Sequence, residues 1–101
     1  MKAPKRTPCS ECPWRRVAPA GWLGPETAEG WINIVLGDGL IACHMTIPGH
    51  DLADMTQCAG AAIFRANVAK IPRSSAVHKL PKNRDEVFAT PAEFRQHHQG
   101  E

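Results

Sequence analysis

Residues 8–16 read PCSECPWRR, and this stretch decides more about the fold than any other part of the 101-residue chain. Cys9 and Cys12 form a Cys-x2-Cys pair, a spacing at which a tight turn can aim both sulfurs at one ion. The prolines and glycine among residues 9–22 predict a turn-rich loop around the pair. The stretch therefore predicts half of a metal site, held by a loop.

The other half of the site must come from Cys43 and Cys58, which are isolated in the sequence. The apolar run at residues 40–43 predicts a brief buried strand or extended segment that delivers Cys43. Cys58 lies near the start of an expected helix, where the helix dipole and backbone N–H groups favour a thiolate. We therefore expect all four cysteines, Cys9 and Cys12 included, to ligate one metal.

Several residues beside the cysteines are candidates for supporting roles. His44 can replace one cysteine as ligand, but adjacent residues rarely both reach one ion, so a hydrogen-bonding role is preferred. Arg15 and Arg16 either donate to the sulfurs or form a solvated basic patch. Trp14 and Trp22 either shield the sulfurs from water or present a surface to a partner, and packing over the site is preferred.

The spacing leaves the identity of the metal open between zinc and an iron–sulfur cluster of the [4Fe–4S] type. One close pair followed by isolated cysteines, together with the Cys12-Pro13 dipeptide, is also found at iron–sulfur sites. Zinc is preferred, because structural zinc commonly compensates for a thin core in a small domain and its binding energy contributes to folding.

The composition predicts such a thin core. Only 25 large apolar side chains remain once alanine and cysteine are set aside, beside nine prolines and eight glycines. No apolar run approaches the roughly 20 residues of a membrane-spanning helix, so no membrane partner is expected. The basic, proline-rich N-terminus does not resemble a signal peptide, which favours a reducing cytoplasmic location and metal ligation over disulfides.

Periodicity predicts three helices, and the fold class is expected to be small α+β, mostly α, with long irregular loops. The first helix has an apolar stripe from Ala28 to Leu36, with Pro25 and Glu26 in its first turn and Trp31 in the core. The second is expected from residue 52 or 55 to residue 70, with Met55, Cys58, Ala59, Ala62, Ile63 and Ala66 on its inner face. A turn is expected at Pro48-Gly49. The third begins at the capping pattern Thr90-Pro91-Ala92-Glu93 and is expected to fray through His97 and His98.

The chain is divided into a flexible lead at residues 1–8, a cysteine-rich metal-binding core at 9–70, and a basic loop with a short helix at 71–101. The formal charge is +4 over residues 1–16, −5 over residues 17–64 and +3 from residue 65 onward. The last basic stretch offers candidate nucleic-acid contacts, namely Lys70, Arg73, Lys79, Lys82 and Arg84.

The ordered pattern PCxxCPWR at residues 8–15, Cys43-His44 and Cys58-Ala59-Gly60 resembles a family of small proteins found in phage and prophage genomes. The resemblance covers roughly residues 8–64. It implies that the four cysteines and His44 act as one unit and that the chain comes from a phage or an integrated element, but it implies no activity. The Cys-x2-Cys-Pro-x-Arg portion is also similar to the cluster-binding WhiB-like regulators, whose remaining cysteines are spaced differently.

These observations predict a metal-stabilised binding or regulatory module, a phage-type accessory protein that acts on a protein partner through the surface around the cysteine-rich loop and the last helix. The sequence has no catalytic constellation and no phosphate-binding glycine loop, so neither an enzyme nor a small-molecule substrate is expected. The alternatives are a zinc module that binds nucleic acid and an iron–sulfur protein for redox or sensing.

Overall fold

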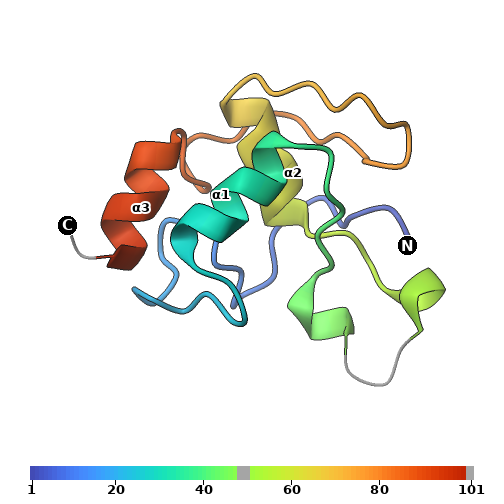
Figure 1. The fold of residues 1–101 in the computed structure, drawn as a ribbon, viewed down its shortest axis with the longest axis horizontal. Helices are drawn as coiled ribbons and strands as arrows, with labels where there is room; N and C mark the ends of the chain where they lie inside the picture. The colour runs from blue at the N-terminus through green and yellow to red at the C-terminus, as the bar shows by residue number, and fades with distance from the viewer. Residues whose placement is uncertain (48–50, 100–101) are drawn as a thin grey trace.

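The computed structural model describes residues 1–47 and 51–99. The described residues form three α-helices, α1 (Ala28–Leu36), α2 (Ala59–Asn67) and α3 (Pro91–Gln99), and single 3-10 turns at His44–Thr46 and Leu52–Asp54 (Figure 1). The mostly α class is confirmed. Of the two alternatives expected for residues 40–43, the structure has the extended segment, with one isolated bridge from Ala42 to Gln57. The turn expected at Pro48-Gly49 lies outside the described residues.

Helix α1 confirms the predicted stripe but starts later than expected. Thr27 is the N-cap, and its hydroxyl accepts the N–H of Gly30 at 3.0 Å, so Pro25 and Glu26 precede the helix instead of forming its first turn. Ile32 and Val35 are buried in the core. Leu36, at the end of the expected stripe, is 40% exposed because it lies in the last turn, next to Gly37.

Helix α2 is shorter at both ends than the periodicity predicted. It begins only after Cys58, because residues 55–57 pair with the extended segments at residues 2 and 42, so Met55 precedes the helix. It ends at Asn67, where Ala69 adopts φ 59°. The N–H of Lys70 reaches the carbonyl of Arg65 at 2.8 Å, which completes a Schellman-type end without the usual glycine.

Two buried polar residues of α2 form hydrogen bonds to segments outside this helix. The Arg65 guanidinium donates to the carbonyls of Val35 at 2.8 Å and Gly39 at 2.6 Å, and so satisfies carbonyl groups at the end of α1. The Asn67 side chain, 1% exposed, bonds to Asn83, Val87 and Phe88. These bonds fix the long loop between α2 and α3, which periodicity could not order.

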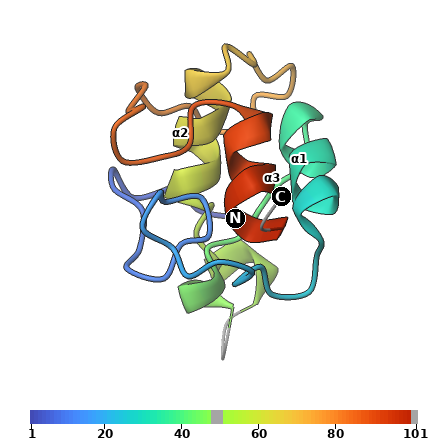
Figure 2. The ribbon, with the colours of Figure 1, turned by 90° about the vertical axis from the view of Figure 1, so that its left-hand side faces the viewer.

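The core is an aromatic cluster that joins the cysteine-rich loop to two helices. Trp14 is 1% exposed, stacks on Phe94 of α3 with ring centroids 4.4 Å apart, and packs on Phe64 of α2 at 4.8 Å. Aromatic pairs of this kind stabilise a fold by about 0.5–1.5 kcal/mol each beyond the burial of their area. Helix α1 packs against both α2 and α3, and Figure 2 shows it directly beside α3, so the last helix belongs to the same core as the first two.

Helix α3 is capped as predicted but does not fray at its histidines. Thr90 accepts the N–H of Glu93 at 3.1 Å, while the carboxylate of Glu93 accepts the N–H of Ala89 and both terminal nitrogens of Arg16. His98 is only 8% exposed: its Nδ1 accepts the N–H of Gly21 at 3.1 Å, and its Nε2 donates to the carbonyl of Pro13 at 2.8 Å. The expected fraying is therefore wrong, because the loop around the cysteine pair supplies two partners for this ring.

The N-terminal lead pairs with the segment at residues 55–57, just before α2. The N–H of Lys2 donates to the carbonyl of Met55 at 2.7 Å, and the N–H of Gln57 donates back to the carbonyl of Lys2 at 3.0 Å. Pro8 is buried just before the cysteine pair. The lead expected to be flexible is thus paired at Lys2 and packed at its other end.

Candidate functional site

The Cys-x2-Cys pair forms a tight turn, as its spacing predicts. The N–H of Cys12 donates to the carbonyl of Cys9 at 3.2 Å, and the N–H of Arg15 donates to the carbonyl of Cys12 at 3.2 Å. The Cys12 side chain is 1% exposed, whereas Cys9 is half-buried. One sulfur of the pair is therefore sealed into the core and the other lies near the surface.

Backbone pairing brings the two isolated cysteines to this turn. The N–H of Cys43 donates to the carbonyl of Thr56 at 2.7 Å, and the N–H of Cys58 donates to the carbonyl of Ile41 at 2.7 Å. Cys58 is the N-cap residue of α2, with extended backbone angles. The extended segment and the helix start thus deliver one cysteine each, as expected from the sequence.

All four cysteines line one pocket of about 330 Å³, together with residues that include Lys5, Thr7 and Met45. The sulfurs of Cys12 and Cys58 lie 3.8 Å apart. The sulfur of Cys9 lies 3.4 Å from Nε2 of His44. Burial is the main cause that raises the pKa of Cys9, and charge repulsion and a hydrogen bond from Cys43 raise it further. The structure therefore gathers the four predicted cysteines around one pocket, with His44 in contact with Cys9, and no disulfide joins the cysteines, all of which it describes.

The buried pair Cys12 and Cys58 divides into a proton donor and an acceptor. The hydrogen bond from Cys12 is the main cause that lowers the pKa of the Cys58 thiol, and the N–H groups of Ala61 and Gly60 and the charge of Arg65 lower it further, against the effect of burial. The same hydrogen bond, together with burial, raises the pKa of Cys12. No side-chain hydrogen bond caps α2, but its first N–H dipoles still favour a thiolate at Cys58.

The pairwise distances match those of zinc ligands. With Zn–S bonds of about 2.3 Å and Zn–N bonds of about 2.0–2.1 Å, neighbouring ligand atoms of a tetrahedral site lie about 3.8 Å apart for two sulfurs and about 3.6 Å apart for sulfur and nitrogen. The contact between Cys12 and Cys58 has the first length, and that between Cys9 and His44 is 0.2 Å shorter than the second. As they stand, however, the described side chains form no group of three or more His, Cys, Asp or Glu residues arranged to hold an ion. The donors meet in pairs, so metal binding stays a prediction.

The supporting residues expected around the sulfurs divide into two groups. Trp14 lies in the core next to the site, since a Cβ at Gly60 would touch both the Cys12 sulfur and Trp14. Arg15 donates to the carbonyl of Ser10 at 3.3 Å and lies 3.7 Å from Glu86. Arg16 donates to the carbonyl of Arg84 and to Glu93. The hydrogen bond of Arg15 lies within its own loop, and those of Arg16 join this loop to the α2–α3 loop and to α3, so a contact with sulfur remains a prediction for each.

Sequence reasoning missed two residues that shape the site. Arg65 supplies a buried positive charge that lowers the pKa of Cys58, and burial lowers the pKa of its guanidinium. Gly60 lets the helix start approach the Cys12 sulfur. The glycine directly after Cys58-Ala59 was a usable signal, because a glycine early in a helix often marks a close approach. Nothing in the sequence distinguishes Arg65 from the other basic residues.

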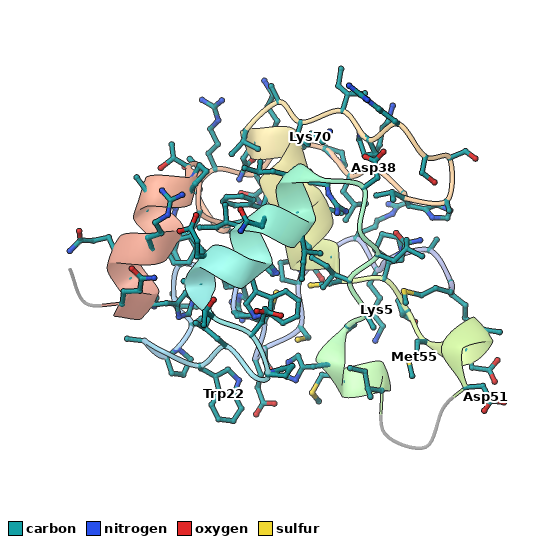
Figure 3. All side chains as sticks on the ribbon, viewed as in Figure 1. Lys5, Trp22, Asp38, Asp51, Met55 and Lys70 are labelled. Carbon is teal, nitrogen blue, oxygen red and sulfur yellow. The ribbon has the colours of Figure 1, made fainter. Side chains whose placement is uncertain are left out.

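An aromatic pocket of about 180 Å³ adjoins the cysteine-lined pocket: Cys58 lines both, whereas His44 lines only the aromatic one. Trp31, expected in the core, is half-buried in its wall and donates its Nε1–H to the carbonyl of Leu23 at 2.7 Å. Trp22 is 53% exposed and projects from the lower edge of the molecule in Figure 3. The second tryptophan of the loop therefore faces solvent at a pocket mouth instead of covering the sulfurs.

The five candidate nucleic-acid contacts are spread over several environments. Lys70 lies 3.9 Å from Asp38, whose carboxylate also accepts the backbone N–H of Arg73. Arg84 donates to the carbonyl of Asn67. Lys79 and Lys82 are exposed. Four of the five candidates, Arg73, Lys79, Lys82 and Arg84, are therefore exposed, and the Arg84 side chain also bonds to the end of α2.

In the described part of the chain, fold and site define a small three-helix protein whose four cysteines gather at one pocket. No family model, no curated protein and no solved structure matches the chain. Among the described residues, none of the helices is both long and apolar enough to cross a membrane. Function must therefore be argued from the residues themselves.

Proposed function

We propose that this chain is a zinc-stapled binding module of the reducing cytoplasm that acts by occupying a surface of another protein. The main support for bound zinc is the 3.8 Å contact between the sulfurs of Cys12 and Cys58, inside a pocket lined by all four cysteines. Cys9 and either Cys43 or His44 would complete a four-ligand set after small side-chain rotations. Bound zinc would hold the ligands as thiolates, and its binding energy would stabilise the fold.

The same contact favours a single ion over the [4Fe–4S] alternative. In such a cluster each cysteine binds a different iron, so its sulfurs lie farther apart than two sulfurs on one ion. The loop that contains Cys12 has no helix or strand of its own, and Trp14, Arg16 and its bonds to His98 attach it to the core. Zinc would join this loop to the start of α2.

The aromatic pocket supports the binding part of the proposal. Trp22, Met45 and Ile47 are each about half exposed, and Trp22 and Ile47 line the pocket mouth beside His44. Tryptophan and methionine are enriched at protein interfaces, where partly exposed aromatic side chains become buried. The zinc site would then hold this surface in position without taking part in a reaction. A phage or prophage accessory role, which the resemblance implies, fits such a module.

Metal analysis of freshly, anaerobically purified protein tests the zinc. We expect a colourless protein with about one zinc per chain. Brown protein with visible absorbance and bound iron would support the cluster instead. Metal-free folded protein whose thiols all react freely would reject the staple altogether.

Capture experiments with matched variants test the surface. A partner retained by the wild type and by Val17→Ala, but lost with Trp22→Ala, would support binding at the aromatic pocket. Val17 is the control because it is 74% exposed and does not line this pocket. Equal capture by all three proteins would contradict the proposed surface.

A further inference from the structure

A groove of about 260 Å³ lies over the second half of α2, at the end of the helix opposite to Cys58. Alanines of α2 and of its end, among them Ala66 and Ala69, form its floor, and the loop that follows supplies Ile71. Ile71 is 71% exposed. The groove therefore combines a smooth apolar floor with an exposed aliphatic side chain.

Three lysines, Lys70, Lys79 and Lys82, line the same groove. Lys79 and Lys82 are exposed, and Lys70 lies 3.9 Å from the carboxylate of Asp38, which is labelled beside it in Figure 3. A partly exposed ion pair at this distance contributes little to stability, so it does not hold Lys70 away from a stronger partner. The rim of the groove is therefore positively charged on an apolar base.

The chemistry of the lining distinguishes between two polyanionic occupants. The groove is lined by alanine, isoleucine, leucine, proline and lysine. Proteins that bind single-stranded nucleic acid stack bases on aromatic side chains, and sequence-reading proteins use arginine forks. This lining supplies neither. A protein segment with alternating acidic and aliphatic side chains can satisfy both the lysines and the apolar floor.

We propose that this lysine-rimmed groove binds an acidic, leucine-rich segment of a partner protein. This inference goes beyond the proposed function, because the groove shares no lining residue with the aromatic pocket or with the cysteine-lined pocket. Acidic side chains of the segment pair with Lys79 and Lys82, and its aliphatic side chains cover Ile71. The binding does not require zinc.

The test uses fluorescence anisotropy with a fluorescein-labelled peptide that repeats Glu-Glu-Leu, a matched peptide that repeats Gln-Gln-Leu, and oligothymidylate. The acidic peptide should bind at least about tenfold more tightly than the glutamine peptide. The double variant Lys79→Glu with Lys82→Glu should lose about tenfold or more in affinity. Lys2→Glu with Arg6→Glu, an equal charge change at exposed residues that do not line the groove, should remain within about twofold of the wild type.

Ile71→Ser separates the apolar contribution, because it alters no charge at a highly exposed position and should still lower peptide affinity about threefold or more. Circular dichroism of each variant checks the fold. The proposal is overturned if the acidic peptide shows no saturable binding or if the lysine variant binds it as well as the wild type. Oligothymidylate binding that is tighter than peptide binding and lost in the lysine variant would assign the groove to nucleic acid instead. Neither result depends on the metal content, so failure here is distinct from failure of the zinc.

Discussion

Gly60 stands directly against the sulfur of Cys12: a Cβ at position 60 would lie 2.3 Å from that sulfur and 2.9 Å from the Cβ of Trp14. Both atoms belong to a buried loop that cannot move aside without shifting the aromatic core. The first turn of α2 can thus contact the cysteine pair only because residue 60 has no side chain.

Gly60→Ala should therefore destabilise the protein by about 1–3 kcal/mol in urea unfolding, the usual cost of overpacking a core. Gly30→Ala is the matched control, because a Cβ there meets only the flexible side chain of Glu26. That control should be neutral or stabilise α1 by up to about 1 kcal/mol, since alanine is the better helix former. Equal stability of Gly60→Ala and the wild type would show that the contact is looser than described.

Removal of metal should lower the melting temperature if the cysteines staple the fold. A chelator is expected to destabilise the wild type and the exposed control Ser10→Ala to the same extent, because structural zinc contributes its binding energy to folding. Cys58→Ser should melt lower from the start and show no further change with chelator. Calorimetry with and without chelator measures this, and the chelator response is decisive because loss of a buried cysteine alone also destabilises. A Cys58→Ser protein that keeps the wild-type chelator response would contradict the staple.

Arg65 should be more important for stability than any exposed arginine. Its guanidinium bonds to Val35 and Gly39 carbonyls at the end of α1, and Arg65→Met would leave these acceptors with no donor in a buried place. Each unsatisfied buried group costs about 1–3 kcal/mol, so we expect a loss of at least about 2 kcal/mol in urea unfolding. Arg6→Met, at an exposed position, should change stability by less than about 0.5 kcal/mol. Similar effects of the two variants would refute the capping role.

His98 should give the fold a pH dependence on the acid side of neutrality. Burial is the main cause that lowers its pKa below 6.5, and His97, whose ring centroid lies 4.9 Å away, lowers it further, while the hydrogen bond to Pro13 opposes this. Protonation would also place a hydrogen on Nδ1, which accepts the N–H of Gly21. Because the folded pKa is the lower one, the stabilising contribution is complete above pH 6.5 and is lost as the pH falls from 6.5 through the folded value.

NMR titration of the histidine rings measures this pKa directly, and the difference in stability between the wild type and His98→Gln should shrink over the same pH range. The two other aromatic side chains at this ring, Phe88 and Phe94, carry no charge. His97→Gln, which leaves both hydrogen bonds of His98 in place, should retain most of the pH dependence. A His98 ring that titrates at or above 6.5 would contradict the predicted direction.

Ala69→Gly should stabilise the end of α2. Ala69 has φ 59°, a left-handed conformation that costs an alanine about 1–2 kcal/mol and a glycine almost nothing. After the greater unfolded-state entropy of glycine is subtracted, a gain of up to about 1 kcal/mol is expected. Ala66→Gly, within α2, is the opposite control and should cost about 1 kcal/mol. Destabilisation by both changes, measured by thermal unfolding, would show that Ala69 is not strained.

The sequence predicts a segment of this fold well when the residues that stabilise that segment are its neighbours in the chain, and poorly when they are distant in the sequence. The start of α3 after Thr90 was predicted because its capping residue lies directly beside the helix that it caps. The start of α2 was placed too early, because residues 55–57 bond to Lys2 and Ala42 instead of joining the helix. His98 was expected to fray, because its partners Gly21 and Pro13 are far away in the sequence.

For the candidate site, the sequence by itself determined the donor types and the turn at Cys9 and Cys12, since a two-residue spacing fixes a local geometry. Only the tertiary structure decided that Cys58 approaches Cys12 to 3.8 Å, that Gly60 permits this approach, and that Arg65 is buried rather than part of a basic surface. The physical reason is the separation in sequence between the groups that interact. Turns and caps are satisfied within a few residues, whereas burial and the charge felt by a thiol depend on groups that chain folding brings together.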